Sequence, residues 1–257
     1  MTNLIHTRAA LRRAVPGLAM LSLAVLVLLI AAYGVWNTSR EPRTTPLARP
    51  SASMASESAY GWAPVGDTTL IIGDSYGVGT GAAKPSERWT TIVAEEMGWV
   101  EVNRALGGTG YYSTSGDEGC GRAVCPFYRD TIVDVAREVD PEVVIISGGQ
   151  NDLSNYLEDP DGVKLVIQDT YRQAAKTFPE AQIIAVGPSV PSGTDDTAVR
   201  MDASVRQAAD EVGAKYVSLL DPPVITPDMV LADGGHVGSE GHAAIAERVI
   251  STLRSSS

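Results

Sequence analysis

The chain has 257 residues, of which 44% are hydrophobic and 20% are charged, so a wholly disordered or fibrous protein is excluded. Its formal net charge of −11 argues against a general nucleic-acid binder, which needs a basic face. We therefore expect at least one folded core and no nucleic-acid partner.

The N-terminal segment differs in character from the rest of the chain. Residues 14–36 are 23 positions without a charged side chain, and three arginines precede them. A helix of this length, rising about 1.5 Å per residue, crosses a hydrocarbon layer of about 30 Å. The pattern predicts a transmembrane signal anchor over residues 14–36, and the basic residues before it favour a cytoplasmic location for residues 1–13.

A cleaved secretory signal is the alternative interpretation of this segment, because a basic start followed by an apolar stretch is typical of both. No clean cleavage site between small residues follows at positions 31–34, which favours the retained anchor. Both interpretations export the rest of the chain. The anchor leaves it on the outer side of the cell membrane, whereas cleavage releases it as a secreted protein.

Two regions follow the apolar segment. Residues 37–66 are rich in Pro, Ser, Thr and Ala and have no apolar period, so we expect a flexible linker. Residues 67–257 have the length of one domain and contain no internal repeat. One folded domain is therefore expected after the linker.

Short apolar runs alternate with amphipathic stretches throughout this domain. The predicted strands are Thr69–Ile72, Val100–Val102, Val143–Ile146, Ile183–Val186 and Tyr216–Leu219. The predicted helices are Glu87–Met97, Thr131–Val139, Val163–Phe178, Thr197–Val212 and Glu240–Leu253, with Ser86 and Ser239 as N-caps. This alternation predicts a flavodoxin-like three-layer α/β/α sandwich with a mainly five-stranded parallel sheet. Functional groups then gather at the carboxyl ends of the strands.

A serine follows the first predicted strand, in the segment Gly73-Asp74-Ser75-Tyr76-Gly77. On a tight turn from strand to helix its hydroxyl is exposed and its N–H can face a developing oxyanion, so Ser75 is the candidate nucleophile. The segment also fits the G-x-S-x-G elbow of α/β-hydrolases, but that elbow normally lies deep in a larger sheet. By itself the triplet is also compatible with an ordinary loop and helix cap.

Three further polar, glycine-bearing segments follow later strands. They are Asn103–Gly110, Ser147–Asp152 and Asp233–His242. Together with the Gly-Asp-Ser turn, this ordered set resembles the SGNH (GDSL-like) hydrolase family over about residues 68–254. The resemblance implies a serine hydrolase that requires no cofactor.

The resemblance also assigns roles to individual residues. Ser75 corresponds to the nucleophile, His236 to its general base, and Asp233 to the group that orients the imidazole. The family usually has a proline after its catalytic histidine, where this chain has Val237, so a less rigid loop is expected there.

The backbone N–H of Ser75, a glycine N–H and the Asn151 side-chain amide correspond to an oxyanion hole. The family's spacing selects Gly108 as the glycine donor, and the adjacent Gly107 stays an alternative. A simple Asx-turn at the end of a strand is the competing interpretation of Asn151.

His242 begins the last predicted helix, where we expect a packing or capping role. A metal site of His236, His242 and Asp233 is disfavoured, because no clear set of three or four ligands accompanies them. We therefore expect no metal.

Residues 109–128 form a long connection that we expect to overhang the active site. Cys120 and Cys125 lie five positions apart within it, and an oxidising compartment would let them form a disulfide. Tyr111 and Tyr112 either stack on a substrate or belong to a small local core, and the sequence leaves both options open.

The leading hypothesis is an extracytoplasmic serine esterase that hydrolyses acyl esters, O-acetyl esters among them, through an acyl-serine intermediate. Its substrate would be a small-molecule or glycan ester. The same triad fits an O-acyltransferase that modifies cell-envelope glycans, and a catalytically silent glycan-binding module on the same scaffold is a third alternative.

Overall fold

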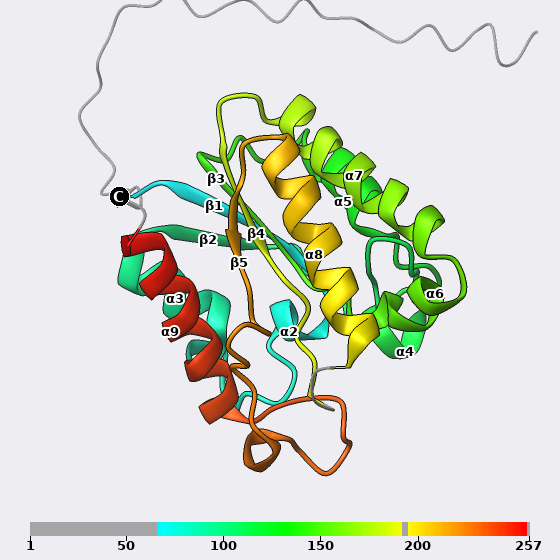
Figure 1. The fold of residues 1–257 in the computed structure, drawn as a ribbon. Coiled ribbons are helices and arrows are strands. Elements are labelled where there is room, and N and C mark those ends of the chain that lie inside the picture. The colour runs from blue at the N-terminus through cyan, green and yellow to red at the C-terminus, as the bar shows by residue number, and fades with distance from the viewer. Residues whose placement is uncertain (1–65, 192–194, 256–257) are drawn as a thin grey trace, which may run out of the picture. The chain divides into compact units, whose positions relative to one another are not determined.

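The computed structural model describes residues 66–191 and 195–255, and they form an α/β domain around a single sheet (Figure 1). The strands are β1 (Thr68–Gly73), β2 (Val100–Asn103), β3 (Val143–Ser147), β4 (Gln182–Val186) and β5 (Lys215–Val217). They are all parallel and lie in the order β2-β1-β3-β4-β5. This is the strand order of flavodoxin-like folds, so the predicted five-stranded parallel sheet is confirmed.

Helices cover both faces of the sheet (Figure 1). One face carries α3 (Trp89–Met97) and α9 (Ser239–Ser255), and the other carries α5 (Tyr128–Val135), α7 (Pro160–Thr177) and α8 (Asp196–Glu211). The shorter helices are α2 (Ser75–Val78), α4 (Asp117–Cys120) and α6 (Leu153–Glu158), with 3-10 turns η1 (Pro85–Glu87), η2 (Gln150–Asp152) and η3 (Pro227–Met229).

The two central strands β1 and β3 supply both cores. Successive side chains of a strand point to opposite faces. Leu70 and Ile72 accordingly pack with α5, α7 and α8, whereas Ile71 packs with α3 and α9. All three are fully buried, and each such burial stabilises the fold by about 1.5–3 kcal/mol. The continuous apolar runs of these strands therefore fix their central position.

Both predicted helix caps are wrong. Ser86 lies inside η1, and α3 begins two residues later than predicted, after Arg88, which makes no side-chain capping bond. The Trp89 N–H at the start of α3 instead lies 3.5 Å from Nδ1 of His242. Ser239 is the first residue of α9, and its hydroxyl donates to Glu87 Oε2 at 2.6 Å instead of capping its own helix.

Two other element boundaries shift for local reasons. Helix α5 begins at Tyr128 instead of Thr131, because the Tyr128 N–H donates to the Gly110 carbonyl at 2.9 Å as the chain enters the helix. Strand β5 ends at Val217, before the predicted Leu219. The Ser218 hydroxyl there accepts the N–H groups of the next turn, at 3.2 Å each, and ends the sheet pairing.

The predicted anchor over residues 14–36 and all but the last residue of the predicted linker over residues 37–66 lie outside the described residues. Among the residues that the structure does describe, no helix has the length and apolar character that a membrane crossing requires.

Candidate active site

Ser75 lies where β1 turns into α2, at the carboxyl edge of the sheet. The turn is tight because glycines permit close packing on both sides. A Cβ on Gly73 would lie 2.9 Å from the Ser147 carbonyl oxygen, and one on Gly77 would lie 2.8 Å from the Ala105 Cβ. Asp74 caps α2 by accepting the Tyr76 N–H at 2.9 Å. The two glycines therefore let this turn pack closely against β3 and against the segment after β2.

His236 and Asp233 reach Ser75 from the segment between η3 and α9. The His236 Nε2 lies 2.9 Å from the Ser75 Oγ, and its Nδ1 lies 2.7 Å from the Asp233 Oδ2. The other Asp233 oxygen accepts the backbone N–H groups of Gly235 and His236, at 3.0 and 3.1 Å. The hydrogen bond from His236 is the main reason that the pKa of Asp233 falls to about 2. An ionised carboxylate therefore faces the imidazole at neutral pH.

This chain of contacts has a defined chemical capacity. When Nδ1–H donates to the carboxylate, Nε2 carries a lone pair that faces the serine hydroxyl. Such an imidazole can take the hydroxyl proton as a nucleophile attacks, and the carboxylate stabilises the imidazolium that forms. The structure thus brings together the three side chains that the motifs predict, from segments separated by most of the domain.

The segment that carries His236 is anchored on both sides. Val230 and Val237 pair as an antiparallel bridge, and the Leu231 N–H donates to the His236 carbonyl at 2.8 Å. Val237, which stands where the family usually has proline, is fully buried among residues of the α3/α9 core. Backbone pairing and burial therefore hold the histidine segment without the proline.

A four-residue turn with two central glycines, residues 106–109, lies across from Ser75 and is called the glycine turn below. The Thr109 N–H and hydroxyl both donate to the Leu106 carbonyl, at 3.3 and 2.7 Å. Gly108 has φ +73°, a conformation that glycine adopts without a steric penalty. Gly107 and Gly108 both line the cleft over Ser75.

Asn151 stands on η2, beyond the end of β3. Its side-chain Nδ2 donates to the Thr109 carbonyl at 2.8 Å, and the residue lines the same cleft as Ser75 and His236. An amide nitrogen carries two N–H donors, so this bond leaves one of them for another acceptor. Asn151 therefore both holds the end of the glycine turn and carries a donor at the cleft.

Asp152 is not among the residues that the motifs predict for the site, although it completes the segment after β3. It is fully buried and accepts the N–H groups of Tyr111, Tyr112 and Ser113 at 2.7, 3.2 and 2.7 Å. Burial raises its pKa despite these donors. An acid directly after the asparagine is the only sequence signal of this role, which is to tie residues 111–113 to the site.

Asp74, next to the nucleophile, is a second buried acid. One oxygen accepts the Tyr76 N–H, and the other lies in a closed space where a Cβ on Gly148 would meet both it and the Tyr128 hydroxyl. Burial raises the pKa of Asp74 to about 7. Its carboxyl group is therefore partly protonated at neutral pH, one residue away from Ser75.

His242 packs and does not reach the cleft. Its ring is fully buried, and Nε2 donates to the Thr80 carbonyl at 3.1 Å while Nδ1 faces the Trp89 N–H. Burial lowers its pKa, which favours the neutral ring that these contacts need. The predicted packing or capping role is confirmed. Within residues 66–191 and 195–255, no group of three His, Cys, Asp or Glu side chains is arranged to hold a metal ion.

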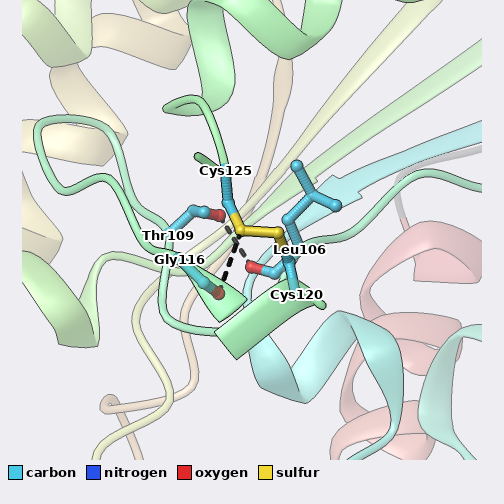
Figure 2. Close-up of a disulfide and its surroundings, with 5 residues drawn as sticks. All are labelled: Leu106, Thr109, Gly116, Cys120 and Cys125. Carbon is cyan, nitrogen blue, oxygen red and sulfur yellow. Dashed lines mark hydrogen bonds between the residues drawn. A yellow bond between two sulfur atoms is a disulfide. The ribbon is translucent and has the colours of Figure 1, made fainter. Parts of the chain in front are cut away.

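The connection over residues 109–128 contains the predicted disulfide between Cys120 and Cys125, which lies beside Leu106 and Thr109 of the glycine turn (Figure 2). Tyr111 is buried in a local aromatic cluster with Tyr128 and Tyr171, and Tyr112 is half exposed. Neither tyrosine lines the cleft, which has a volume of about 460 Å³. Of the two options for Tyr111, the structure therefore supports the local core.

Other residues of this connection do line the cleft. Glu118 and Gly119 of α4 form one part of its wall. The remaining wall combines polar and apolar groups, namely Thr80, Gln150, Leu153, Val190, Pro191 and Gly235. The long connection thus overhangs the site with a backbone turn and one acidic side chain, and not with aromatic rings.

Comparison with known proteins identifies the family to which this site belongs. Residues 71–244 match the model of the GDSL-like Lipase/Acylhydrolase family, and this range covers more than half of the chain. The chain belongs to this family. As a GDSL-like protein it is an ester hydrolase with a serine active site, and all the segments that carry Ser75, Asn151, Asp233 and His236 fall within the matched range.

Individual relatives agree with this placement. The chain is 26% identical over 189 residues to a GDSL lipase of Mycobacterium tuberculosis (Rv0518), covering 70% of this chain and 78% of that lipase. Its fold is similar to that of TesA, with a TM-score of 0.59 at 18% identity over 74% of this chain and 99% of TesA. A family two carbohydrate esterase from Cellvibrio japonicus also has a TM-score of 0.59, at 18% identity over 75% of this chain and 62% of the esterase. At such identities the two structures support the fold alone.

Proposed function

We propose that this GDSL-like hydrolase cleaves acyl esters through a covalent acyl-Ser75 intermediate. The observation that carries the proposal is the continuous hydrogen-bonded chain from Ser75 Oγ through His236 to Asp233, with contacts of 2.9 and 2.7 Å. Ser75 is only 8% exposed and lines the cleft, where a substrate can approach its hydroxyl.

The reaction begins when the Ser75 Oγ attacks the ester carbonyl carbon and its proton passes to His236 Nε2. The carbonyl π electrons move to the oxygen and form a tetrahedral oxyanion. As the oxyanion collapses, the bond to the alcohol breaks, and His236 returns the proton to the departing oxygen. In the second half-reaction, His236 takes a proton from water as the water oxygen attacks the acyl-Ser75 carbonyl. His236 then returns the proton to the Ser75 oxygen as the acyl bond breaks, which releases the carboxylic acid and restores the serine.

The oxyanion is stabilised by three donors in this proposal. They are the backbone N–H groups of Ser75 and Gly108 and the side-chain N–H of Asn151 that Thr109 leaves unused. All three residues line the cleft, and the bond from Asn151 to Thr109 keeps the amide against the glycine turn. Removal of a single oxyanion donor typically lowers the rate by about 10²–10³.

The cleft suggests a short acyl group on a neutral, polar alcohol. Its wall combines three apolar side chains, which suit an acyl group, with hydroxyl, amide and backbone groups that suit a hydroxyl-bearing leaving group. The volume of about 460 Å³ accommodates a sugar-sized ester better than a long lipid chain. A glycan O-acyl ester is therefore the proposed natural substrate, in line with the carbohydrate esterase among the structural relatives.

A kinetic experiment tests the chemistry. Purified protein should hydrolyse p-nitrophenyl acetate and butyrate faster than the corresponding decanoate, and Ser75→Ala should abolish turnover. Mass spectrometry of enzyme quenched during turnover should find one acyl group on Ser75. Turnover that survives in Ser75→Ala would contradict the proposal.

Product analysis in a second incubation separates hydrolysis from acyl transfer, and an active-site probe separates both from simple binding. With an acyl donor and a cell-envelope glycan, a hydrolase releases free acid, whereas an acyltransferase yields acylated glycan. A fluorophosphonate probe should label Ser75 in the folded protein. Absence of labelling together with measurable glycan binding would favour the silent binding module instead.

For the location, we propose that residues 14–36 anchor the chain in the cell membrane with the catalytic domain on the outer side. The uncharged segment, the basic residues before it and a disulfide bond, which is typical of oxidising compartments, support this proposal. In a bacterial host the full chain should remain in carbonate-washed membranes, and protease added to spheroplasts should digest the domain. Release of a shortened chain into the medium would indicate a cleaved signal, and protection from protease would indicate a cytoplasmic domain.

A further inference from the structure

The segment over residues 115–125 forms a small closed unit, called the disulfide hairpin below. Ser115 and Cys125 pair through two backbone hydrogen bonds of 2.9 and 3.1 Å, and the Cys120–Cys125 disulfide closes the smaller loop between the two cysteines. The Cys125 sulfur also lies 3.4 Å from the Gly116 carbonyl oxygen, a close contact within the hairpin (Figure 2). Backbone pairing thus holds the two ends of the hairpin together, and the disulfide ties Cys120, next to Gly119, to the Cys125 end.

The hairpin packs directly on the glycine turn. A Cβ on Gly107 would overlap the Gly119 carbonyl oxygen, and one on Gly119 would lie 2.5 Å from the Gly107 carbonyl oxygen. A Cβ on Gly108 would lie 2.6 Å from the Ser115 hydroxyl. Backbone therefore lies against backbone, with no space for even a methyl group between the two segments.

This contact has no polar bond to hold it. Among the described residues, no hydrogen bond joins the hairpin to the glycine turn. The disulfide itself lies beside Leu106 and Thr109, the two ends of that turn (Figure 2). Van der Waals attraction falls steeply with distance. If reduction of the disulfide lets the hairpin move away, its packing on the glycine turn weakens.

We propose that the Cys120–Cys125 disulfide positions the oxyanion donor, by pressing the hairpin against the glycine turn. The disulfide is then a positioning element for catalysis in addition to a brace for the fold, and the oxidised enzyme is the active form. This inference rests on the proposed function, because it assigns the glycine turn to the oxyanion hole. Displacement of the turn weakens contacts that exist only in the transition state, so it lowers kcat and leaves KM nearly unchanged.

Reversible reduction tests the proposal on the full chain. Dithiothreitol gives two electrons and two protons to the disulfide, which yields two thiols, and is itself oxidised to its cyclic disulfide. We expect kcat for p-nitrophenyl acetate to fall about tenfold or more on reduction, to recover on reoxidation, and to be low but insensitive to dithiothreitol in the Cys120→Ser/Cys125→Ser variant.

A pair of glycine substitutions tests the contact while the disulfide stays intact. Gly119→Ala places a methyl group against Ser115 and Gly107 and should lower kcat as reduction does. Gly116→Ala makes the same change in the same hairpin, but the nearest atom to its new methyl group would be the Ala123 carbonyl oxygen, at an ordinary 3.5 Å. The control should therefore keep the activity of the unmodified enzyme.

A tetrahedral inhibitor separates positioning from stability. The Ser75 oxygen donates an electron pair to the boron of phenylboronic acid while its proton passes to His236 Nε2. The resulting tetrahedral anion presents an oxygen to the oxyanion donors. Its affinity should fall by the same factor as kcat on reduction and in Gly119→Ala, at a temperature where near-ultraviolet circular dichroism reports a folded protein.

The outcomes are distinct. If reduction lowers the melting temperature but leaves kcat and boronate affinity within twofold, the disulfide only braces the fold and the inference is wrong. A kcat that falls equally in Gly116→Ala and Gly119→Ala would also overturn it. If the oxidised enzyme itself has no Ser75-dependent turnover, the proposed function fails, and the inference fails with it.

Discussion

The side chain of Asn151 donates a 2.8 Å hydrogen bond to the carbonyl of Thr109, the last residue of the glycine turn. This bond links the end of β3 to the loop after β2, on the two sides of Ser75. We propose that the same amide also donates to the oxyanion, so one side chain both shapes and completes the hole.

Loss of this amide should affect the chemical step. We expect Asn151→Ala to lower kcat by about 10²–10³ with a small change in KM, because the donor acts on the transition state. Asn151→Asp keeps the shape but removes the donor, and should be at least as damaging. Asn155→Ala, which alters an amide whose oxygen faces Ser113 at 3.4 Å, serves as the control in steady-state assays. A full kcat in Asn151→Ala would contradict the proposed hole.

Asp233→Asn tests the orientation of the imidazole. An amide at this position offers an N–H or an oxygen to Nδ1 and no longer stabilises the imidazolium, so we expect kcat to fall by about 10⁴. Asp228→Asn changes an exposed carboxylate on the nearby η3 and should retain activity. If the two variants were equally active, Asp233 would have no role in the mechanism.

The Asp233 carboxylate should also contribute to stability in a pH-dependent manner. Its pKa is lowered from 3.8 to about 2, chiefly by the bond from His236, so the folded state binds fewer protons than the unfolded state in this range. The contribution is fully present above the ordinary value and is lost as the pH falls toward 2. The melting temperatures of the unmodified protein and Asp233→Asn should therefore differ at pH 6 and converge in strong acid.

The buried Asp74 should make the stability of the fold depend on pH in the opposite direction. Burial raises its pKa from 3.8 to about 7, so the folded state holds a proton that the unfolded state has lost. The free energy of unfolding consequently falls as the pH rises from about 4. The destabilisation by the ionised, buried carboxylate is complete above about pH 7. Asp74→Asn keeps an oxygen for the Tyr76 N–H and should gain melting temperature at pH 8 more than at pH 5. Asp159→Asn controls for the loss of a capping carboxylate at an exposed N-cap.

Glu118 should select substrates by charge. It is the acidic side chain of the cleft wall and is exposed to solvent, so its field is modest and screened by salt. We expect Glu118→Gln to raise kcat/KM for p-nitrophenyl hemisuccinate about two- to tenfold at low salt, with little change for the neutral acetate. Asp117→Asn alters the adjacent acid, which does not line the cleft. It should leave the ratio of kcat/KM for the hemisuccinate to kcat/KM for the acetate unchanged. A ratio that is the same in all three proteins would exclude charge selection by Glu118.

The sheet could be predicted from sequence because its three inner strands, β1, β3 and β4, carry short apolar runs. β1 contains the apolar run Leu70–Ile72 and β3 the apolar run Val143–Ile146, and all of these residues are buried. Boundaries shifted where a side chain provided a local hydrogen bond, as Ser218 does at the end of β5. The start of α3 was not predictable, since the group facing its first N–H is His242, 153 positions away.

The candidate site was predictable as a set of residues but not as a cavity. Motif order brings Ser75, His236 and Asn151 to one edge of the sheet. The wall of the cleft depends on how the connection after the glycine turn folds back, and no period in residues 109–128 reveals that Tyr111 turns into the core while Glu118 faces the cleft. The role of Asp152 depends likewise on three backbone N–H groups that no sequence pattern displays.

The base and its carboxylate partner are carried by one short segment, fastened by the Val230–Val237 pair outside the main sheet. If that fastening opens, His236 and Asp233 leave together, while the nucleophile and the five strands stay in place. Heat inactivation can therefore precede global unfolding and reverse on cooling, since only this segment has to pair and pack again on the α3/α9 core.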